Sequence, residues 1–280
     1  MNIIRTGLRL AMTFCLLSGV AMASSGQPHA QTIAIEFGVA PQHSAGDLSR
    51  RWTPVLQYLS RKTGYDLRFR TGKDVPTYQR QCIEGQYDMI YINPYHYANL
   101  IRPKSGYEAF AKEKDGKLVG VVVVRKDSAY RTLRDLHGKV VAFPGRTAIV
   151  ATLMPLADFK ASGTSVQEHY VSSHESAFHA VAKGLYDAGG GDMKTLTNMN
   201  PELRDQLRIL WTGVPLPPLV FAAHPRVPEQ AVRRVQEAMI AMDHDPAAVR
   251  LLQSLDFKGI VAARDSDYDA VRTLRLEVPQ

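Results

Sequence analysis

A short phrase occurs twice in this chain, as EGQYD over residues 84–88 and as KGLYD over residues 183–187. In each copy a helical pattern stops at a glycine, Gly85 or Gly184, which adopts a left-handed helix-ending conformation more easily than any other residue. A run of small or apolar residues follows, of the kind that forms a buried parallel strand. The repetition predicts two α/β lobes with the same helix-to-strand junction.

Polar segments follow both predicted strands. The first is YINPY over residues 91–95, and the second is GGGD over residues 189–192, which we expect to form a loop. Open α/β sheets bind ligands at the carboxyl ends of their parallel strands. The two segments therefore predict one ligand site to which both lobes contribute.

The first residues have the organisation of a secretory signal peptide. Arg5 and Arg9 precede an apolar run over residues 10–20, and a small-x-small cleavage pattern ends at Ala23. Cleavage after Ala30 is an alternative. The run is shorter than the roughly 18 residues that a spanning helix needs. We expect a signal peptide over residues 1–23 and a periplasmic product that does not span the membrane once it is cleaved; an uncleaved anchor is the other option.

Composition excludes several classes of function. The formal charge of +7 falls to +5 without Arg5 and Arg9, and the positive charge is spread along the sequence, which favours anionic partners but not nucleic acid. Cys82 is the only cysteine of the exported part, so no intramolecular disulfide is expected. There is no metal-type Cys/His spacing and no cofactor fingerprint, so we expect no metal, cofactor or catalytic residue.

The hydrophobic pattern alternates between strands and helices. Strands are predicted over residues 33–39, 65–70, 89–92, 118–124, 139–143 and 168–171, and helices over residues 47–63, 74–84, 95–100, 153–162, 173–181, 228–243, 246–255 and 267–276. Residues 118–124 and the proline-rich residues 214–221 read as two crossings between lobes. The expected organisation is lobe 1 over residues 31–120 plus 220–280, and lobe 2 over residues 121–219.

The order of these motifs resembles the phosphonate-binding subunits of ABC importers over nearly the whole exported chain. The most specific matches are YINP at 91–94, the segment SHESA at 173–177 that leads to GLYD at 184–187, and the Pro217 region before a dibasic helix. The resemblance implies a type II periplasmic-binding-protein fold, in which two lobes with mostly parallel sheets flanked by helices are joined by two crossover strands. It also implies closure on a small oxyanion such as phosphonate, phosphite or phosphate.

One segment departs from the family pattern. Where the family has a Ser-Thr-Ser-Gly-like run that holds phosphoryl oxygens, this chain reads GRTAIVA over residues 145–151. The N–H groups of a helix start still attract an anion, so we expect Ala148 to lie at the site and Arg146 and Thr147 to supply the lost contacts. A different or weaker ligand is equally compatible.

The expected ligand-binding residues of lobe 1 are Tyr91, Asn93 and Tyr95. A phenol and an amide at a strand end can donate hydrogen bonds to an anion. The alternatives are that Tyr91 packs in the core, that Asn93 caps the next turn, and that Tyr95 only packs.

The expected residues of lobe 2 are His174, Glu175 and Asp187. An imidazole donates to an oxyanion, and a carboxylate accepts from a ligand ammonium or a protonated oxygen. Alternatively, Ser172 or Ser173 caps the helix, the dipole favours Glu175 in its first turn, and Asp187 satisfies loop amides.

The main hypothesis is a periplasmic solute-binding protein that captures a small anion and presents it to an ABC permease. A second hypothesis is presentation to a periplasmic sensor. A third, enzymatic hypothesis would use His174 and Glu175 as acid-base groups with Thr147 as nucleophile, but no nucleophile elbow supports it.

Overall fold

The computed structural model describes residues 33–274 and residue 276. The chain divides into residues 1–31 and a compact unit of residues 32–280. The predicted signal peptide lies outside the described residues. No described helix is both long enough and apolar enough to cross a membrane.

Lobe 1 is built on a mixed sheet with the strand order β11-β4-β10-β3-β1-β2. In this sheet β10 and β11 run opposite to the other strands. The strands are β1 (Ala34–Val39), β2 (Asp66–Thr71), β3 (Met89–Ile92), β4 (Glu108–Glu113), β10 (Val220–Ala223) and β11 (Ile260–Ala262).

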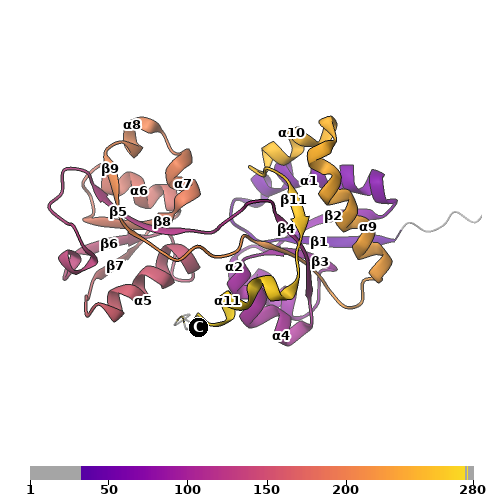
Figure 1. Ribbon diagram of the computed structural model, residues 1–280, viewed down its shortest axis with the longest axis horizontal. Coiled ribbons are helices and arrows are strands. Elements are labelled where there is room, and N and C mark those ends of the chain that lie inside the picture. The colour runs from indigo at the N-terminus through magenta and orange to yellow at the C-terminus, as the bar shows by residue number, and fades with distance from the viewer. Residues whose placement is uncertain (1–32, 275, 277–280) are drawn as a thin grey trace, which may run out of the picture. The chain divides into compact units, whose positions relative to one another are not determined.

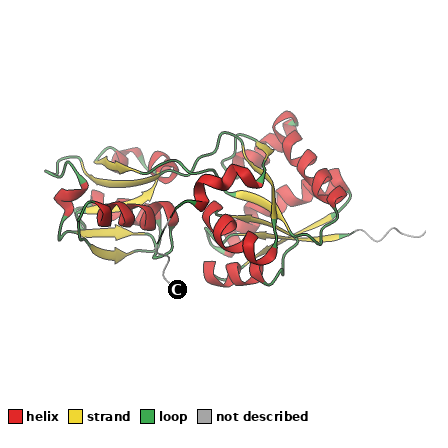
Figure 2. Ribbon diagram, turned by 60° about the horizontal axis from the view of Figure 1, so that its bottom comes forward, coloured by secondary structure: helices red, strands yellow, loops and turns green. Residues whose placement is uncertain are grey.

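Helices cover both faces of this sheet (Figures 1 and 2). One face carries α1 (Ala45–Thr63), α9 (Glu229–Ile240), η4 (Ala241–His244) and α10 (Pro246–Ser254). The other carries α2 (Val75–Ile83), α3 (Pro94–His96), η1 (Tyr97–Ile101), α4 (Arg102–Ser105), η5 (Asp265–Tyr268) and α11 (Asp269–Arg272). The expected helix over residues 267–276 is therefore shorter than its hydrophobic pattern indicated.

Lobe 2 is built on a second sheet with the order β7-β6-β8-β5-β9, in which only β5 runs against the others. Its strands are β5 (Gly120–Arg125), β6 (Val140–Phe143), β7 (Gln167–Tyr170), β8 (Ala188–Asp192) and β9 (Leu207–Thr212). The helices are η2 (Leu133–Leu136), η3 (Ile149–Leu153), α5 (Met154–Ala161), α6 (His174–Ala182), α7 (Met193–Asn198) and α8 (Pro201–Arg204).

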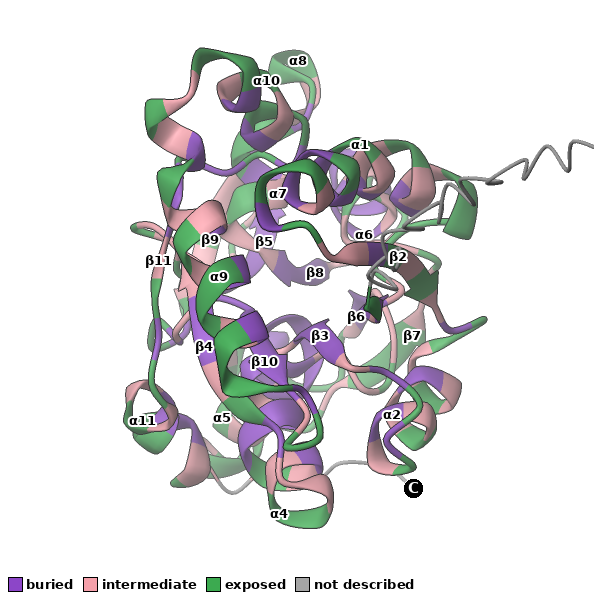
Figure 3. Cartoon of the chain, turned by 90° about the vertical axis from the view of Figure 1, so that its right-hand side faces the viewer, coloured by how far each residue is buried: buried purple, intermediate pink, exposed green. Residues whose placement is uncertain are grey.

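The chain passes between the sheets twice, before β5 and between β9 and β10. At the crossing Leu118 and Leu216 form an antiparallel bridge. The valine run after it is buried on both sides: Val121 and Val123 pack beneath α6, and Val122 and Val124 pack beneath α5. A continuous apolar run is what a strand covered on both faces requires. Figure 3 shows the same burial for β3, β5, β8 and β10.

The repeated phrase folds as predicted in both lobes. Gly85 (φ 67°) and Gly184 (φ 72°) are left-handed. Each phrase ends in an aspartate that accepts a hydrogen bond from the backbone of a neighbouring strand: Asp88 from Glu36, and Asp187 from Val140. The same kind of hydrogen bond thus anchors β1 in lobe 1 and β6 in lobe 2.

The glycines at 189–191 are not a loop, contrary to expectation, but form most of β8, and all three are buried. A Cβ on Gly190 would lie 2.1 Å from the carbonyl oxygen of Ala151, and one on Gly191 would lie 2.0 Å from the ring of Phe178. Both distances are far below van der Waals contact. Glycine is needed here so that η3 and α6 can pack directly on the strand, not for the approach of a ligand.

Candidate functional site

A close contact between an imidazole and a carboxylate lies at the carboxyl end of β8. Nδ1 of His174, the first residue of α6, is 2.8 Å from Oδ2 of Asp192. The ring is turned away from a linear hydrogen bond, and this buried nitrogen has no other polar partner among the described residues. The contact places a half-buried imidazole, with its side chain 32% exposed, at the strand end where such sheets bind ligands.

Asp192 is held in place from its other side by α7. Its carboxylate accepts hydrogen bonds from the backbone N–H of Thr195 at 2.8 Å and from the Thr195 hydroxyl at 2.7 Å. Burial on its own raises the pKa of Asp192, but the His174 contact and the Thr195 bonds outweigh it and lower that pKa to about 2. The Asp192 carboxylate is thus ionised at neutral pH.

The segment after β6 presents helix N–H groups in the same lobe. Ala148 precedes η3 with extended backbone, and η3 continues into α5. Thr152 and Leu153 donate to the Ala148 carbonyl, whereas the N–H groups of residues 149–151 have no partner within the helix. The Thr152 hydroxyl is used internally, since it donates to the carbonyl of Gly145.

The apolar side chains of this turn do not replace the missing hydroxyls. Ile149 and Val150 are buried, 3% and 6% exposed, in a cluster that includes Leu216. Tyr95 of lobe 1 packs against the same cluster. The structure therefore brings one expected residue of lobe 1 to the helix start of lobe 2.

Arg146 and Thr147 flank this turn. The guanidinium carbon of Arg146 lies 4.5 Å from the ring centre of Tyr170, at the end of β7. The planar cation stacks on the aromatic face and keeps its N–H groups available. Thr147 is half-buried. Both residues are in the loop where the sequence analysis expected them to meet an anion.

Tyr91 lies in an aromatic cluster at the end of β3. Its ring stacks on Phe221 with centroids 4.6 Å apart, and Trp52 and Phe257 lie at 5.0 and 5.9 Å. Burial, followed by the charge of Glu113, raises the pKa of Tyr91 well above its usual value. The ring packs in the core, as the alternative predicted, while the hydroxyl forms no hydrogen bond with the described residues.

Asn93 caps the next helix. Its Oδ1 accepts from the backbone N–H of Tyr95 at 2.9 Å, which leaves only the amide nitrogen for a ligand. In lobe 2 Glu175 is exposed, and its carboxylate is 3.6 Å from Nε2 of His179, one helical turn away. The structure does not bring Glu175 to the His174–Asp192 pair.

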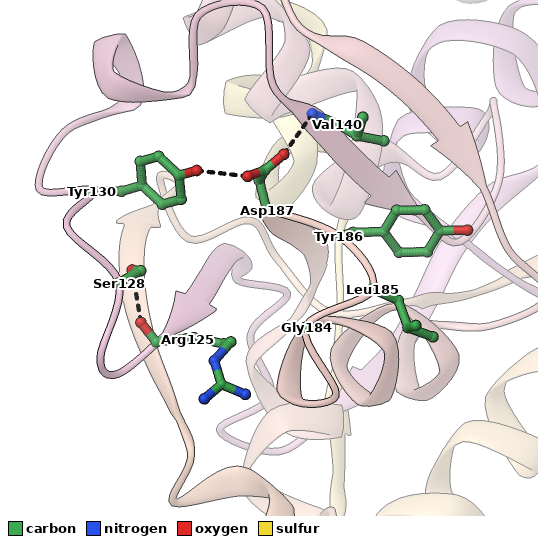
Figure 4. Close-up of a pocket in the computed structure, with 8 residues that line it drawn as sticks. All are labelled: Arg125, Ser128, Tyr130, Val140, Gly184, Leu185, Tyr186 and Asp187. Atoms are coloured by element: carbon green, nitrogen blue, oxygen red, sulfur yellow. Dashed lines mark hydrogen bonds between the residues drawn. The ribbon is translucent and has the colours of Figure 1, made fainter.

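Asp187 lies at the amino end of β8, the opposite end of the strand from Asp192. Figure 4 shows it pointing at Tyr130, whose hydroxyl donates to it at 2.5 Å, and at the backbone N–H of Val140 at 3.1 Å. The pocket there encloses about 230 Å³ and is lined by Arg125, Ser128, Tyr130, Val140, Gly184, Leu185, Tyr186 and Asp187. Asp187 accepts hydrogen bonds from the protein's own groups at this end of the strand, and the structure does not bring it to His174.

Two residues near the site have no signal in the sequence. Glu113 ends β4 close enough to Tyr91 for its charge to affect the phenol, and Lys194 lies just after Asp192. The glycine run before Asp192 was the only hint for that aspartate.

The fold defines the chain as a two-lobed type II periplasmic binding protein. The model of the family "ABC transporter, phosphonate, periplasmic substrate-binding protein" matches residues 37–268, so the chain belongs to that family of transport proteins. The phosphonates-binding periplasmic protein of Escherichia coli K12 is 22% identical over 272 residues, covering 91% of this chain and 80% of that protein.

Solved structures agree on the fold. The binding component of an ABC phosphonate transporter from Pseudomonas aeruginosa superposes with a TM-score of 0.71 at 16% identity, covering 86% of this chain and 85% of that one. PhnD1 of Prochlorococcus marinus in complex with methylphosphonate gives a TM-score of 0.73 at 15% identity, covering 85% and 96%.

Proposed function

We propose that this protein captures a small phosphorus oxyanion, of the phosphonate, phosphite or phosphate class, between its lobes. The observation that carries the proposal is the set of anion-binding elements on lobe 2, the helix N–H groups of residues 149–151 and the half-buried His174, together with the packing of Tyr95 against the apolar cluster that includes Ile149 and Val150. Helix amino termini and cations are the two protein features that attract oxyanions most directly.

The geometry supports capture without chemistry. The candidate polar groups of lobe 2 are the His174 imidazole, its carboxylate partner Asp192 and the backbone donors of residues 149–151, and none of them is a nucleophile activated by a neighbouring base. A ligand that contacts both lobes favours a closed arrangement by its differential affinity for that state. Export by cleavage after Ala23 or Ala30, and delivery to a membrane permease, complete the proposal.

Isothermal titration calorimetry of the exported chain with methylphosphonate, phosphite and phosphate tests the ligand class. We expect heat of binding with at least one of them. No heat with any of the three would remove the phosphorus-oxyanion proposal and leave the family fold unaffected.

Two variants test the site itself. Tyr91→Phe and His174→Ala remove a hydroxyl and an imidazole, and each should weaken binding by about 1–3 kcal/mol if it donates to a buried anion. Tyr186→Phe and His169→Ala are matched controls, because these rings stack on each other at 4.7 Å elsewhere in lobe 2. Equal affinity in all four variants would mean that neither Tyr91 nor His174 contacts the ligand.

A further inference from the structure

A groove of about 470 Å³ lies where α7 of lobe 2 meets the turn between α10 and β11 of lobe 1. Lobe 2 lines it with Lys194, Thr197 and Asn198, and lobe 1 with Gln253, Asp256, Phe257 and Lys258. Lys194 is the second residue of α7 and follows the Asp192 cap by two positions. A side chain next to the candidate ligand site therefore reaches lobe 1.

Lys194 makes three contacts, all with lobe 1. Its ammonium donates to the carbonyl of Asp256 at 3.0 Å, lies 3.9 Å from the Glu113 carboxylate, and lies 5.9 Å from the ring centre of Phe257. A carbonyl, a carboxylate and an aromatic face are the three partners that an ammonium prefers in proteins. No hydrogen bond, ion pair or ring contact of this lysine side chain with lobe 2 is present among the described residues.

The carbonyl of Asp256 is held for this contact by an unusual turn. Asp256 has φ 59°, and the N–H of Phe257 reaches back to the Leu252 carbonyl at 2.9 Å, as in a helix end that normally carries glycine. The Asp256 carboxylate is fixed in turn by Arg51 at 3.0 Å. The acceptor therefore does not depend on Lys194 for its orientation.

Glu113 connects Lys194 with the candidate ligand site. Burial raises the pKa of Glu113, and the Lys194 charge opposes that effect. Glu113 in turn acts on the phenol of Tyr91. Without Lys194 beside it, the Glu113 carboxylate would repel an anion bound near Tyr91. The position of Lys194 therefore affects the local charge at the candidate ligand site.

We propose that Lys194 is a positioning residue that bridges the two lobes, by docking on Asp256 and Phe257 and neutralising Glu113. The bridge itself uses only groups of the protein, whereas its consequence for ligand capture rests on the proposed function. Because Lys194 follows Asp192 so closely, the bridge fixes the His174–Asp192 pair relative to the Tyr91 cluster.

The distance between the lobes in solution tests the bridge without a ligand. Spin labels on Gln230→Cys and Glu202→Cys, both exposed and in different lobes, report that distance by pulsed electron resonance. Cys82 is buried and its pKa is raised to about 12, so it does not take up label. Lys194→Met should broaden the distribution of label-to-label distances or shift it to longer values. We expect the ratio of bridged to unbridged molecules to fall about fivefold.

Two further variants make the result specific. Lys183→Met removes the same charge from an exposed position of lobe 2 and should leave the distances unchanged, and Lys194→Arg keeps a cation of similar reach and should preserve most of the bridge. The proposal would be overturned if Lys194→Met and the parent chain gave the same distance distribution. It would also be overturned if Lys183→Met changed the distribution as much as Lys194→Met does.

Titration with methylphosphonate extends the test. We expect Lys194→Met to bind about fivefold more weakly, and Glu113→Gln in the same chain to restore part of the loss because the unpaired carboxylate is gone. If no phosphorus oxyanion binds the parent chain, the proposed function fails while the distance measurement still decides the bridge. An unchanged affinity in Lys194→Met, where the parent chain binds, would contradict the link to capture.

Discussion

The carboxylate of Asp187 accepts a hydrogen bond from the backbone N–H of Val140 at 3.1 Å, and so ties the first residue of β6 to the start of β8. The pair matches the bond from Glu36 to Asp88 in lobe 1, at 2.8 Å. The second copy of the repeated phrase therefore performs a structural task that the first copy also performs. A ligand role for Asp187 would have to be separate from this task.

Asp187→Asn should destabilise the protein by about 1–3 kcal/mol and leave ligand affinity unchanged. The carboxylate accepts hydrogen bonds from both the Val140 N–H and the Tyr130 hydroxyl. The asparagine amide has one acceptor oxygen, and its NH₂ group would face one of these two donors. Urea unfolding and calorimetric titration measure the two quantities. Asp205→Asn, at an exposed position, is the control. A loss of affinity without a loss of stability would return Asp187 to the ligand site.

Gly190→Ala should destabilise lobe 2 by about 3 kcal/mol or more. The added methyl would lie 2.1 Å from a backbone oxygen of η3, which cannot rotate away as a side chain can. Gly145→Ala is the control, because nothing lies within 4 Å of a Cβ there. Thermal unfolding of the two variants gives the comparison, and equal melting temperatures would mean that η3 does not rest on β8 in solution.

Much of the fold could be predicted because its signals are local. The caps at Gly85 and Gly184 and the valine run of β5 depend on a few neighbouring residues, and the structure confirms them. The strands β4, β9 and β11 and the strand role of residues 189–191 were missed, since each depends on contacts with elements that are distant in the sequence. A glycine that lets a helix pack closely on a strand, such as Gly190, cannot be told from the sequence alone from a glycine that ends a helix, such as Gly85.

The candidate site was predictable in its parts but not in its connections. His174 and Asn93 follow predicted elements closely, so the sequence indicates them. The pairing of His174 with Asp192 joins residues 18 positions apart, and the contact of Lys194 with Asp256 joins residues 62 positions apart. The number of residues between two positions does not predict such contacts, because tertiary packing brings the residues together.

His96 should make the protein less stable as the pH falls from 6.5 to 4. Burial lowers the pKa of His96 to about 4, and its Nε2 has no hydrogen-bonding partner among the described residues. Between these two pH values the unfolded chain binds the proton and the folded chain does not, so protonation favours unfolding. The full effect is about 3 kcal/mol.

The measurement is the urea midpoint at several pH values. His96→Leu should remove most of this slope, whereas His43→Leu, at an exposed position, should keep it. A parent chain with the same stability at pH 6.5 and pH 4 would show that His96 is not buried as a neutral group.

Ala148→Ser should tighten oxyanion binding by about fivefold. Ala148 precedes the helix start and is only half-buried, so a hydroxyl fits there without disturbing Ile149 or Val150. One added hydrogen bond contributes about 1 kcal/mol. Titration with methylphosphonate gives the value, and Ser162→Ala at the far end of α5 serves as a stability control. An unchanged affinity in Ala148→Ser would place the ligand away from this turn.

His174→Ala should cost stability as well as ligand affinity. Asp192 is ionised above pH 3.8 in the unfolded chain and above about pH 2 in the folded chain, so its paired state adds stability at neutral pH that is lost as the pH falls toward 2. Without His174 the partly buried carboxylate loses its imidazole partner, and we expect a loss of about 3 kcal/mol at pH 7.

The pH dependence separates this electrostatic cost from a simple loss of packing. At pH 3 the unpaired Asp192 takes up a proton in the folded variant, so the difference between His174→Ala and the parent chain should narrow. Adding Asp192→Asn should recover part of the loss at pH 7, because the amide keeps the helix cap without a charge. Urea unfolding at both pH values measures this, and a loss of stability that is equal at pH 7 and pH 3 would mean that the charge of Asp192 does not cause it.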